Sequence, residues 1–177
     1  IVIVACGTAF YSGLTAKYAI EHWTRIPCEV ELAHEFRYRD PVIGASTLVV
    51  SISQSGETMD TLMAVKYAKE RGTVNVSVCN TQSATIPRES DAVVYTHAGP
   101  EVAVASTKAF LAQITALYLL GIYTATVRGT MTDERREELL TEFQTIPEKV
   151  RTVLGVRERI HELANWMADT RSVLYLG

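Results

Sequence analysis

The segment TLVVSISQSGET, residues 47–58, joins a mostly apolar run to a turn that carries several hydroxyl groups. Residues 47–52 have the length of a strand and the Val, Ile and Leu content typical of a strand that is covered on both faces. From Thr58 to Arg71 the apolar side chains recur every three or four residues, which predicts a helix. The segment therefore predicts a buried strand, a polar turn and a helix, the repeating unit of an α/β fold.

Similar apolar runs lie on both sides of this segment, at residues 1–5, 28–32, 74–78 and, more weakly, 92–95. A second helical pattern occupies residues 11–23. Because strands and helices alternate, and the strands are not apolar only at every second residue, we predict a parallel sheet with helices on both faces. The expected fold class is α/β, a three-layer α/β/α sandwich with a five-stranded parallel sheet.

The composition changes after Arg128, where charged side chains surround a sparse apolar set. Thr132 or Asp133 is placed to cap a first helix, Pro147 suits the first turn of a second, and Gly155 separates a third. We therefore expect a domain over residues 1–127, a helical connector over 128–170 and a strand-like run over 171–177. Because the chain both opens and closes in an apolar run, we expect it to be a fragment of a longer protein.

The overall composition excludes several classes of protein. The 177 residues are 47% apolar and 21% charged, as in ordinary globular domains. Seventeen basic and twenty acidic side chains give a net charge of −3, so no positive field favours nucleic acid. Cys6, Cys28 and Cys79 lack the number and spacing of a disulfide framework or a zinc site, so we expect no metal and a cytoplasmic location.

One uncharged stretch, residues 109–127, approaches the length of a membrane span, which needs about 20 apolar residues. Gln113 and Thr115 interrupt it, and Tyr118 and Tyr123 lie away from the usual interfacial positions. We expect a helix buried in the protein core, and no contact with a membrane.

Three loops are candidates for chemistry, because each follows a predicted strand or precedes a predicted helix, where open α/β sheets bind ligands. They are ACGTA (5–9), SQSGET (53–58) and EVAVASTK (101–108). In the second loop, hydroxyls surround a glycine at a helix start, where free N–H groups and a partial positive charge favour a phosphate. The alternative is that these hydroxyls only cap the helix. The chain has neither a Walker loop nor a dinucleotide fingerprint, which disfavours nucleotides.

Two residues in the other loops have two interpretations each. Cys6 could be a reactive thiol, but no His is apparent near it, and we favour a buried structural thiol. Glu101 is either a general acid or base beside the pocket, or the structural ion-pair partner of Lys108, whose charge is unfavourable in a first helical turn. The four histidines share no metal-ligand spacing, and we expect them at the surface or in packing.

Together with VELAHEFRYR (30–39), RESD (88–91) and VASTKAF (104–110), the loops resemble the sugar isomerase (SIS) domain. Within that family the chain is similar to the isomerase half of the glutamine–fructose-6-phosphate aminotransferases. The resemblance implies that residues 1–127 are a first SIS domain and that 171–177 begin a second. It also implies a homodimeric enzyme, without a cofactor, that forms glucosamine 6-phosphate and glutamate from fructose 6-phosphate and glutamine.

The resemblance also implies site residues: Ser53, Gln54, Ser55 and Thr58 for the phosphate, and Thr8, Ser106 and the backbone near Val104 for the sugar. Ala9 stands where many relatives carry a serine, so one hydroxyl contact is missing. The family places its main proton-transfer residues in the second repeat, so we expect this chain alone to be inactive, with Glu101 as its one catalytic candidate. The alternative function is a non-catalytic SIS module that senses a sugar phosphate for a transcription regulator.

Overall fold

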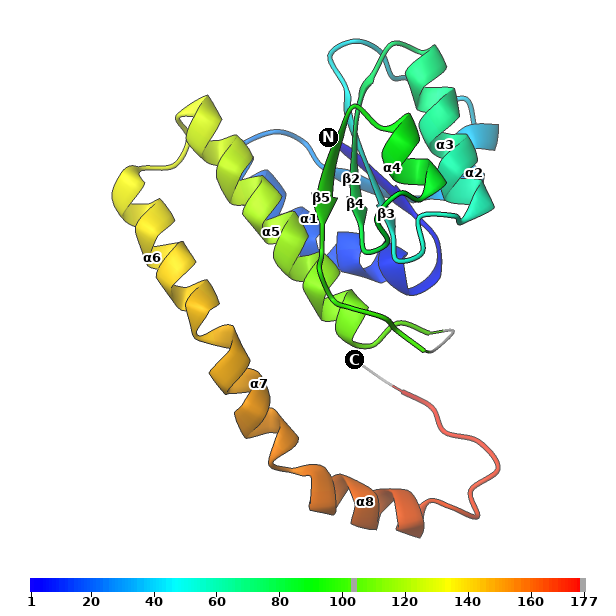
Figure 1. Cartoon of the computed structure of the whole chain (residues 1–177), viewed down its shortest axis with the longest axis vertical. Coiled ribbons are helices and arrows are strands. Elements are labelled where there is room, and N and C mark those ends of the chain that lie inside the picture. The colour runs from blue at the N-terminus through cyan, green and yellow to red at the C-terminus, as the bar shows by residue number, and fades with distance from the viewer. Residues whose placement is uncertain (103–104, 176–177) are drawn as a thin grey trace. The chain divides into compact units, whose positions relative to one another are not determined.

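The structure is a computed structural model, and it describes residues 1–102 and 105–175. The chain forms two compact units, unit 1 over Ile1–Thr132 and unit 2 over Asp133–Gly177. Figure 1 labels the elements. The elements of unit 1 are β1 (Val2–Ala5), α1 (Gly7–Thr24), β2 (Glu29–Leu32), α2 (Ala33–Tyr38), β3 (Leu48–Ser53), α3 (Met59–Glu70), β4 (Val74–Cys79), α4 (Thr85–Glu89), β5 (Ala92–Tyr95) and α5 (Lys108–Arg128).

The sheet of unit 1 has five strands in the order β2-β1-β3-β4-β5, and every neighbouring pair is parallel. On β1, Val2 lies opposite Glu29 of β2 on one side and Val49 of β3 on the other. The α/β class and the five-stranded parallel sheet are therefore confirmed. The weakest predicted strand, residues 92–95, forms the edge strand β5.

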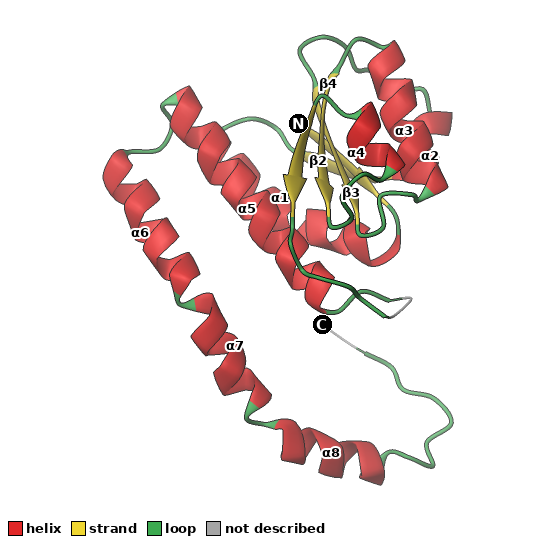
Figure 2. Ribbon diagram, in the orientation of Figure 1, coloured by secondary structure: helices red, strands yellow, loops and turns green. Residues whose placement is uncertain are grey.

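Helices lie on both faces of the sheet (Figure 2), which explains why the strands are apolar at consecutive positions. Ile3 packs with Ile20 of α1 and Leu117 of α5 on one face of the sheet. Val4, the next residue, packs with Phe36 of α2 on the other face, in a cluster that also includes residues of α3. Because helices cover both faces, both sets of side chains leave water, and each buried aliphatic side chain stabilises the fold by about 1.5–3 kcal/mol.

Helix α5 is, by length and composition alone, apolar enough to cross a membrane. In the fold it lies along α1, where Gly121 permits close approach: a Cβ there would stand 3.1 Å from the Ile20 side chain. The rings of Trp23 and Tyr118 meet edge to face at 5.5 Å between centroids. One side of this helix packs in the core of unit 1, but only about a third of its apolar stretch is buried, so the expectation of a helix buried in the core is met on that side alone.

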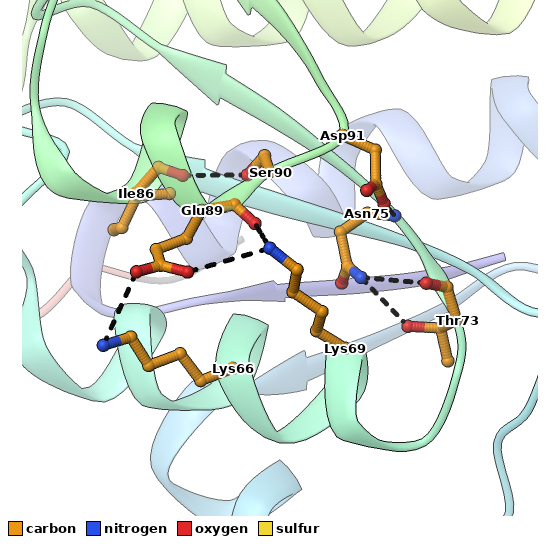
Figure 3. Close-up of polar contacts among 8 residues, drawn as sticks. All are labelled: Lys66, Lys69, Thr73, Asn75, Ile86, Glu89, Ser90 and Asp91. Atoms are coloured by element: carbon orange, nitrogen blue, oxygen red, sulfur yellow. Dashed lines mark hydrogen bonds and ion pairs between the residues drawn. The ribbon is translucent and has the colours of Figure 1, made fainter.

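Two acidic residues of the RESD motif fasten α4 and β5 to the rest of unit 1, as Figure 3 shows. Glu89 lies 3.6 Å from the Lys66 ammonium and 3.8 Å from that of Lys69, so it ties α4 to α3. Asp91 accepts a 2.7 Å hydrogen bond from the backbone N–H of Asn75 in β4. These contacts explain the motif by packing and hydrogen bonding.

Unit 2 consists of three helices followed by an irregular segment. The helices are α6 (Asp133–Gln144), α7 (Ile146–Leu154) and α8 (Arg157–Trp166), and Pro147 lies in the first turn of α7. We expected a strand over residues 171–177, but residues 171–175 are not in a strand. A strand needs a hydrogen-bonded neighbour, and the described part of unit 2 offers none.

Candidate functional site

A pocket of about 360 Å³ lies at the carboxyl ends of β1 and β3. Its walls come from the end of β1, the first turn of α1, the loop between β3 and α3, and the segment before α5. The lining residues are Cys6, Gly7, Thr8, Ala9, Ile52, Ser53, Gln54, Ser55, Thr58 and Ser106. This is the edge at which open parallel sheets bind ligands.

The loop over residues 53–58 is held in shape by its own hydroxyl groups. The Ser53 hydroxyl accepts a 3.0 Å hydrogen bond from the backbone N–H of Gly56 and lies 3.2 Å from the Thr58 hydroxyl. The Ser55 hydroxyl accepts a 3.2 Å bond from the backbone N–H of Glu57. Gly56 itself has a φ of +70°, a conformation that glycine adopts without strain.

Helix starts give the pocket a positive character without any basic side chain in the loop. Cys6 and Thr58 are the N-cap residues of α1 and α3, and neither makes a side-chain capping hydrogen bond. The alternative that the loop hydroxyls only cap the helix therefore does not hold for Thr58. Free N–H groups and the helix dipoles at these two starts can bind an anion.

The pocket brings together most of the residues expected from the sequence. Six of the seven expected substrate-binding positions line it: Thr8, Ser53, Gln54, Ser55, Thr58 and Ser106. The seventh, Val104, lies outside the described residues. Their roles in binding stay predictions, which the proximity of these side chains supports.

In the part of the chain that the structure describes, Glu101 bonds to Thr107 and not to Lys108, the ion-pair partner that we considered for it. One carboxylate oxygen accepts hydrogen bonds of 2.7 Å from both the backbone N–H and the hydroxyl of Thr107, just before α5. These bonds lower the pKa of the Glu101 carboxyl below its usual range. Among the described residues no ion pair joins Glu101 to Lys108, because the carboxylate is directed to Thr107 instead. Glu101 is not among the residues that line the pocket, and its catalytic role stays a prediction.

Sequence reasoning missed two features around the site. Asn80, which follows β4, accepts bonds from the Thr96 hydroxyl and the Ala98 N–H, at 2.9 and 2.8 Å, and donates to the Gly99 carbonyl at 2.8 Å. The sequence signal that could have identified Asn80 is its position just after a predicted strand. Cys6, which we interpreted as buried, is half-exposed and lines the pocket.

The histidine that the sequence did not place near Cys6 is His34. The fold brings Cys6, His34 and Asp60 together, with one potential ligand atom from each within 4.8 Å of the others. The expectation that no His lies near this thiol was therefore wrong, because His34 comes from α2, beyond both α1 and β2 in the sequence.

Comparison with known proteins identifies the family that this chain matches. The family model of the SIS domain matches residues 1–123. The chain is 66% identical over 177 residues to a glutamine–fructose-6-phosphate aminotransferase [isomerizing] from Leifsonia xyli, and 62% identical over 178 residues to that of Corynebacterium diphtheriae. It is covered completely in both alignments but spans only 29% and 28% of these curated relatives.

A solved structure agrees with the sequence comparison. The C-terminal domain of glucosamine-fructose-6-phosphate aminotransferase from Francisella tularensis superposes with a TM-score of 0.91 and 40% sequence identity. The match covers 95% of this chain and 48% of that one. A matching family model over most of the sequence, together with this parallel five-stranded fold, leads to one conclusion: the chain belongs to the SIS domain family.

Proposed function

We propose that this chain is the sugar-phosphate-binding part of the isomerase domain of a glutamine–fructose-6-phosphate aminotransferase. The parent enzyme would make glucosamine 6-phosphate and glutamate from fructose 6-phosphate and glutamine. The observation that carries the proposal is one pocket, at two uncapped helix starts, lined by six hydroxyl- or amide-bearing residues that the sequence motifs single out. The aminotransferases that match the whole chain favour this function over a sensor module of a transcription regulator.

In the proposed complex the phosphate lies against the loop of residues 53–58. Backbone N–H groups at the start of α3 and the hydroxyls of Ser55 and Thr58 donate to its oxygens, and the helix dipole offsets its charge. The sugar lies toward Thr8 and Ser106, which line the same pocket. We further propose a cytoplasmic location, which the three free cysteines support.

The proposed binding is tested by calorimetric titration of the chain with glucosamine 6-phosphate and, in parallel, with glucosamine. Each hydrogen bond to a charged group contributes about 1.5–3 kcal/mol, so loss of the phosphate should weaken binding by roughly tenfold or more. Inorganic phosphate should compete with glucosamine 6-phosphate for the same pocket. Equal affinities for the phosphorylated and unphosphorylated sugars would contradict the proposal.

We also propose that the chain forms a homodimer. The support is the exposure of large side chains on α1 and α5, two helices that pack on each other: Tyr11, Tyr18, Tyr123 and Val127 are 60–77% exposed. Large apolar side chains exposed on packed helices are often covered by a partner, and a second copy of the chain is the simplest cover for them. Light scattering at tens of micromolar should give a mass near twice the 19.6 kDa of one chain. A mass of one chain at every concentration would count against the dimer.

A further inference from the structure

Three side chains from separate elements meet where β1 ends. Cys6 follows β1, His34 lies in the first turn of α2, and Asp60 lies in the first turn of α3. Helices α2 and α3 pack on the same face of the sheet, side by side in Figure 1, and this packing brings the three residues together. The thiol sulfur, one imidazole nitrogen and one carboxylate oxygen lie within 4.8 Å of one another.

We propose that Cys6, His34 and Asp60 bind a divalent ion of the zinc class. Sulfur and imidazole nitrogen are the donors that zinc prefers, whereas magnesium and calcium require oxygen donors. A thiolate and a carboxylate together balance the charge of a divalent ion. Three protein donors leave a fourth tetrahedral position for water or another small ligand.

The distances permit this coordination after small movements. Around a tetrahedral zinc, with bonds of about 2.0–2.3 Å, neighbouring donor atoms are about 3.3–3.7 Å apart. From the 4.8 Å limit, the donors must therefore approach one another by at most about 1.1–1.5 Å. The His34 side chain is 44% exposed, with its Nε2 3.8 Å from an oxygen of the exposed Glu35 carboxylate, and Asp60 is also exposed, so both have room to turn toward Cys6.

The surroundings of Cys6 suit a metal ligand better than those of the other two thiols. The buried Thr61 hydroxyl directs a hydrogen bond at the Cys6 sulfur, at 3.8 Å, which is the kind of outer contact that orients metal ligands. Burial raises the pKa of Cys28 to about 11 and also raises the pKa of Cys79, so those thiols hold their protons. At Cys6, ion binding forms a sulfur–metal bond and releases the thiol proton to water.

The site is tested with Co²⁺, whose absorption spectrum reports a thiolate ligand and tetrahedral geometry. The untagged chain should bind one Co²⁺, with a sulfur-to-cobalt charge-transfer band, and Zn²⁺ should displace it. The variant Cys6→Ser should lose the charge-transfer band. Because removing one donor removes one of three metal bonds, His34→Gln and Asp60→Asn should each weaken Co²⁺ binding by roughly tenfold or more.

The control variant is His22→Gln, which removes an exposed imidazole of α1 outside the cluster and should bind Co²⁺ as the unmodified chain does. His34 and Asp60 are surface residues, so circular dichroism should show that their variants stay folded. A charge-transfer band that survives in Cys6→Ser, or unchanged Co²⁺ affinity in His34→Gln, would overturn the proposal.

Discussion

Replacing Gly56 with alanine should lower the free energy of unfolding by about 2–4 kcal/mol, because a side chain there meets both backbone strain and a steric clash. Gly56 has a φ of +70°, and an added Cβ would stand 2.5 Å from the Cβ of Ala84 and 2.8 Å from the sulfur of Cys79. The loop cannot move aside freely, because the Gly56 N–H donates to the Ser53 hydroxyl and its carbonyl accepts from the Ile86 N–H. Chemical denaturation monitored by circular dichroism measures the loss.

A second glycine provides the matched control. Gly72 has a φ of +75°, and a Cβ there would meet nothing within 4 Å. The variant Gly72→Ala therefore carries the backbone strain alone, which costs about 1 kcal/mol. The difference between the two variants measures the close packing of the loop against Cys79 and Ala84. Equal losses of stability would show that this packing is not tight.

The sheet could be predicted from sequence because helices cover both of its faces, so the inner strands need apolar side chains on each face. Ile3 and Val4 are successive residues that enter different clusters, so both must be apolar, and such runs are visible without any structure. The turn of residues 53–58 was equally visible, because its hydroxyls and glycine directly precede a helical pattern. Local sequence therefore predicted where the strands lie along the chain and where the polar turn that lines the pocket lies.

Features that depend on contacts between distant segments were not predictable. Helices α2 and α4 have six and five residues, too short for a repeating apolar pattern, and their positions are set by packing on α3. The meeting of Cys6 with His34 depends on that packing. The direction of the Glu101 carboxylate toward Thr107, rather than Lys108, depends on the conformation of the loop before α5.

Removing hydroxyls from the loop over residues 53–58 should weaken glucosamine 6-phosphate binding by roughly tenfold or more. Each hydrogen bond to a charged group contributes about 1.5–3 kcal/mol. Ser55→Ala and Thr58→Ala are the informative variants, since residues 53–58 contain no basic side chain that could compensate. Thr58→Ala also removes the partner that lies 3.2 Å from the Ser53 hydroxyl, but leaves the Ser53 bond to Gly56 in place. The loop should therefore keep its shape, and calorimetry should report the lost contact itself.

The matched hydroxyl deletion is Thr115→Ala on α5, where the half-buried side chain donates a 3.0 Å hydrogen bond to the Leu111 carbonyl of its own helix. It should leave the affinity for glucosamine 6-phosphate unchanged, because Thr115 is outside the pocket. Measuring the affinity of each variant for glucosamine as well distinguishes contacts to the phosphate from contacts to the sugar. Loss of a hydroxyl that contacts the phosphate should weaken binding of the phosphorylated sugar only. If Ser55→Ala and Thr58→Ala both bind glucosamine 6-phosphate as tightly as Thr115→Ala does, the phosphate does not lie on this loop. The N–H groups at the start of α1 and the hydroxyl of Ser106 would then be the remaining groups in the pocket that can donate hydrogen bonds to an anion.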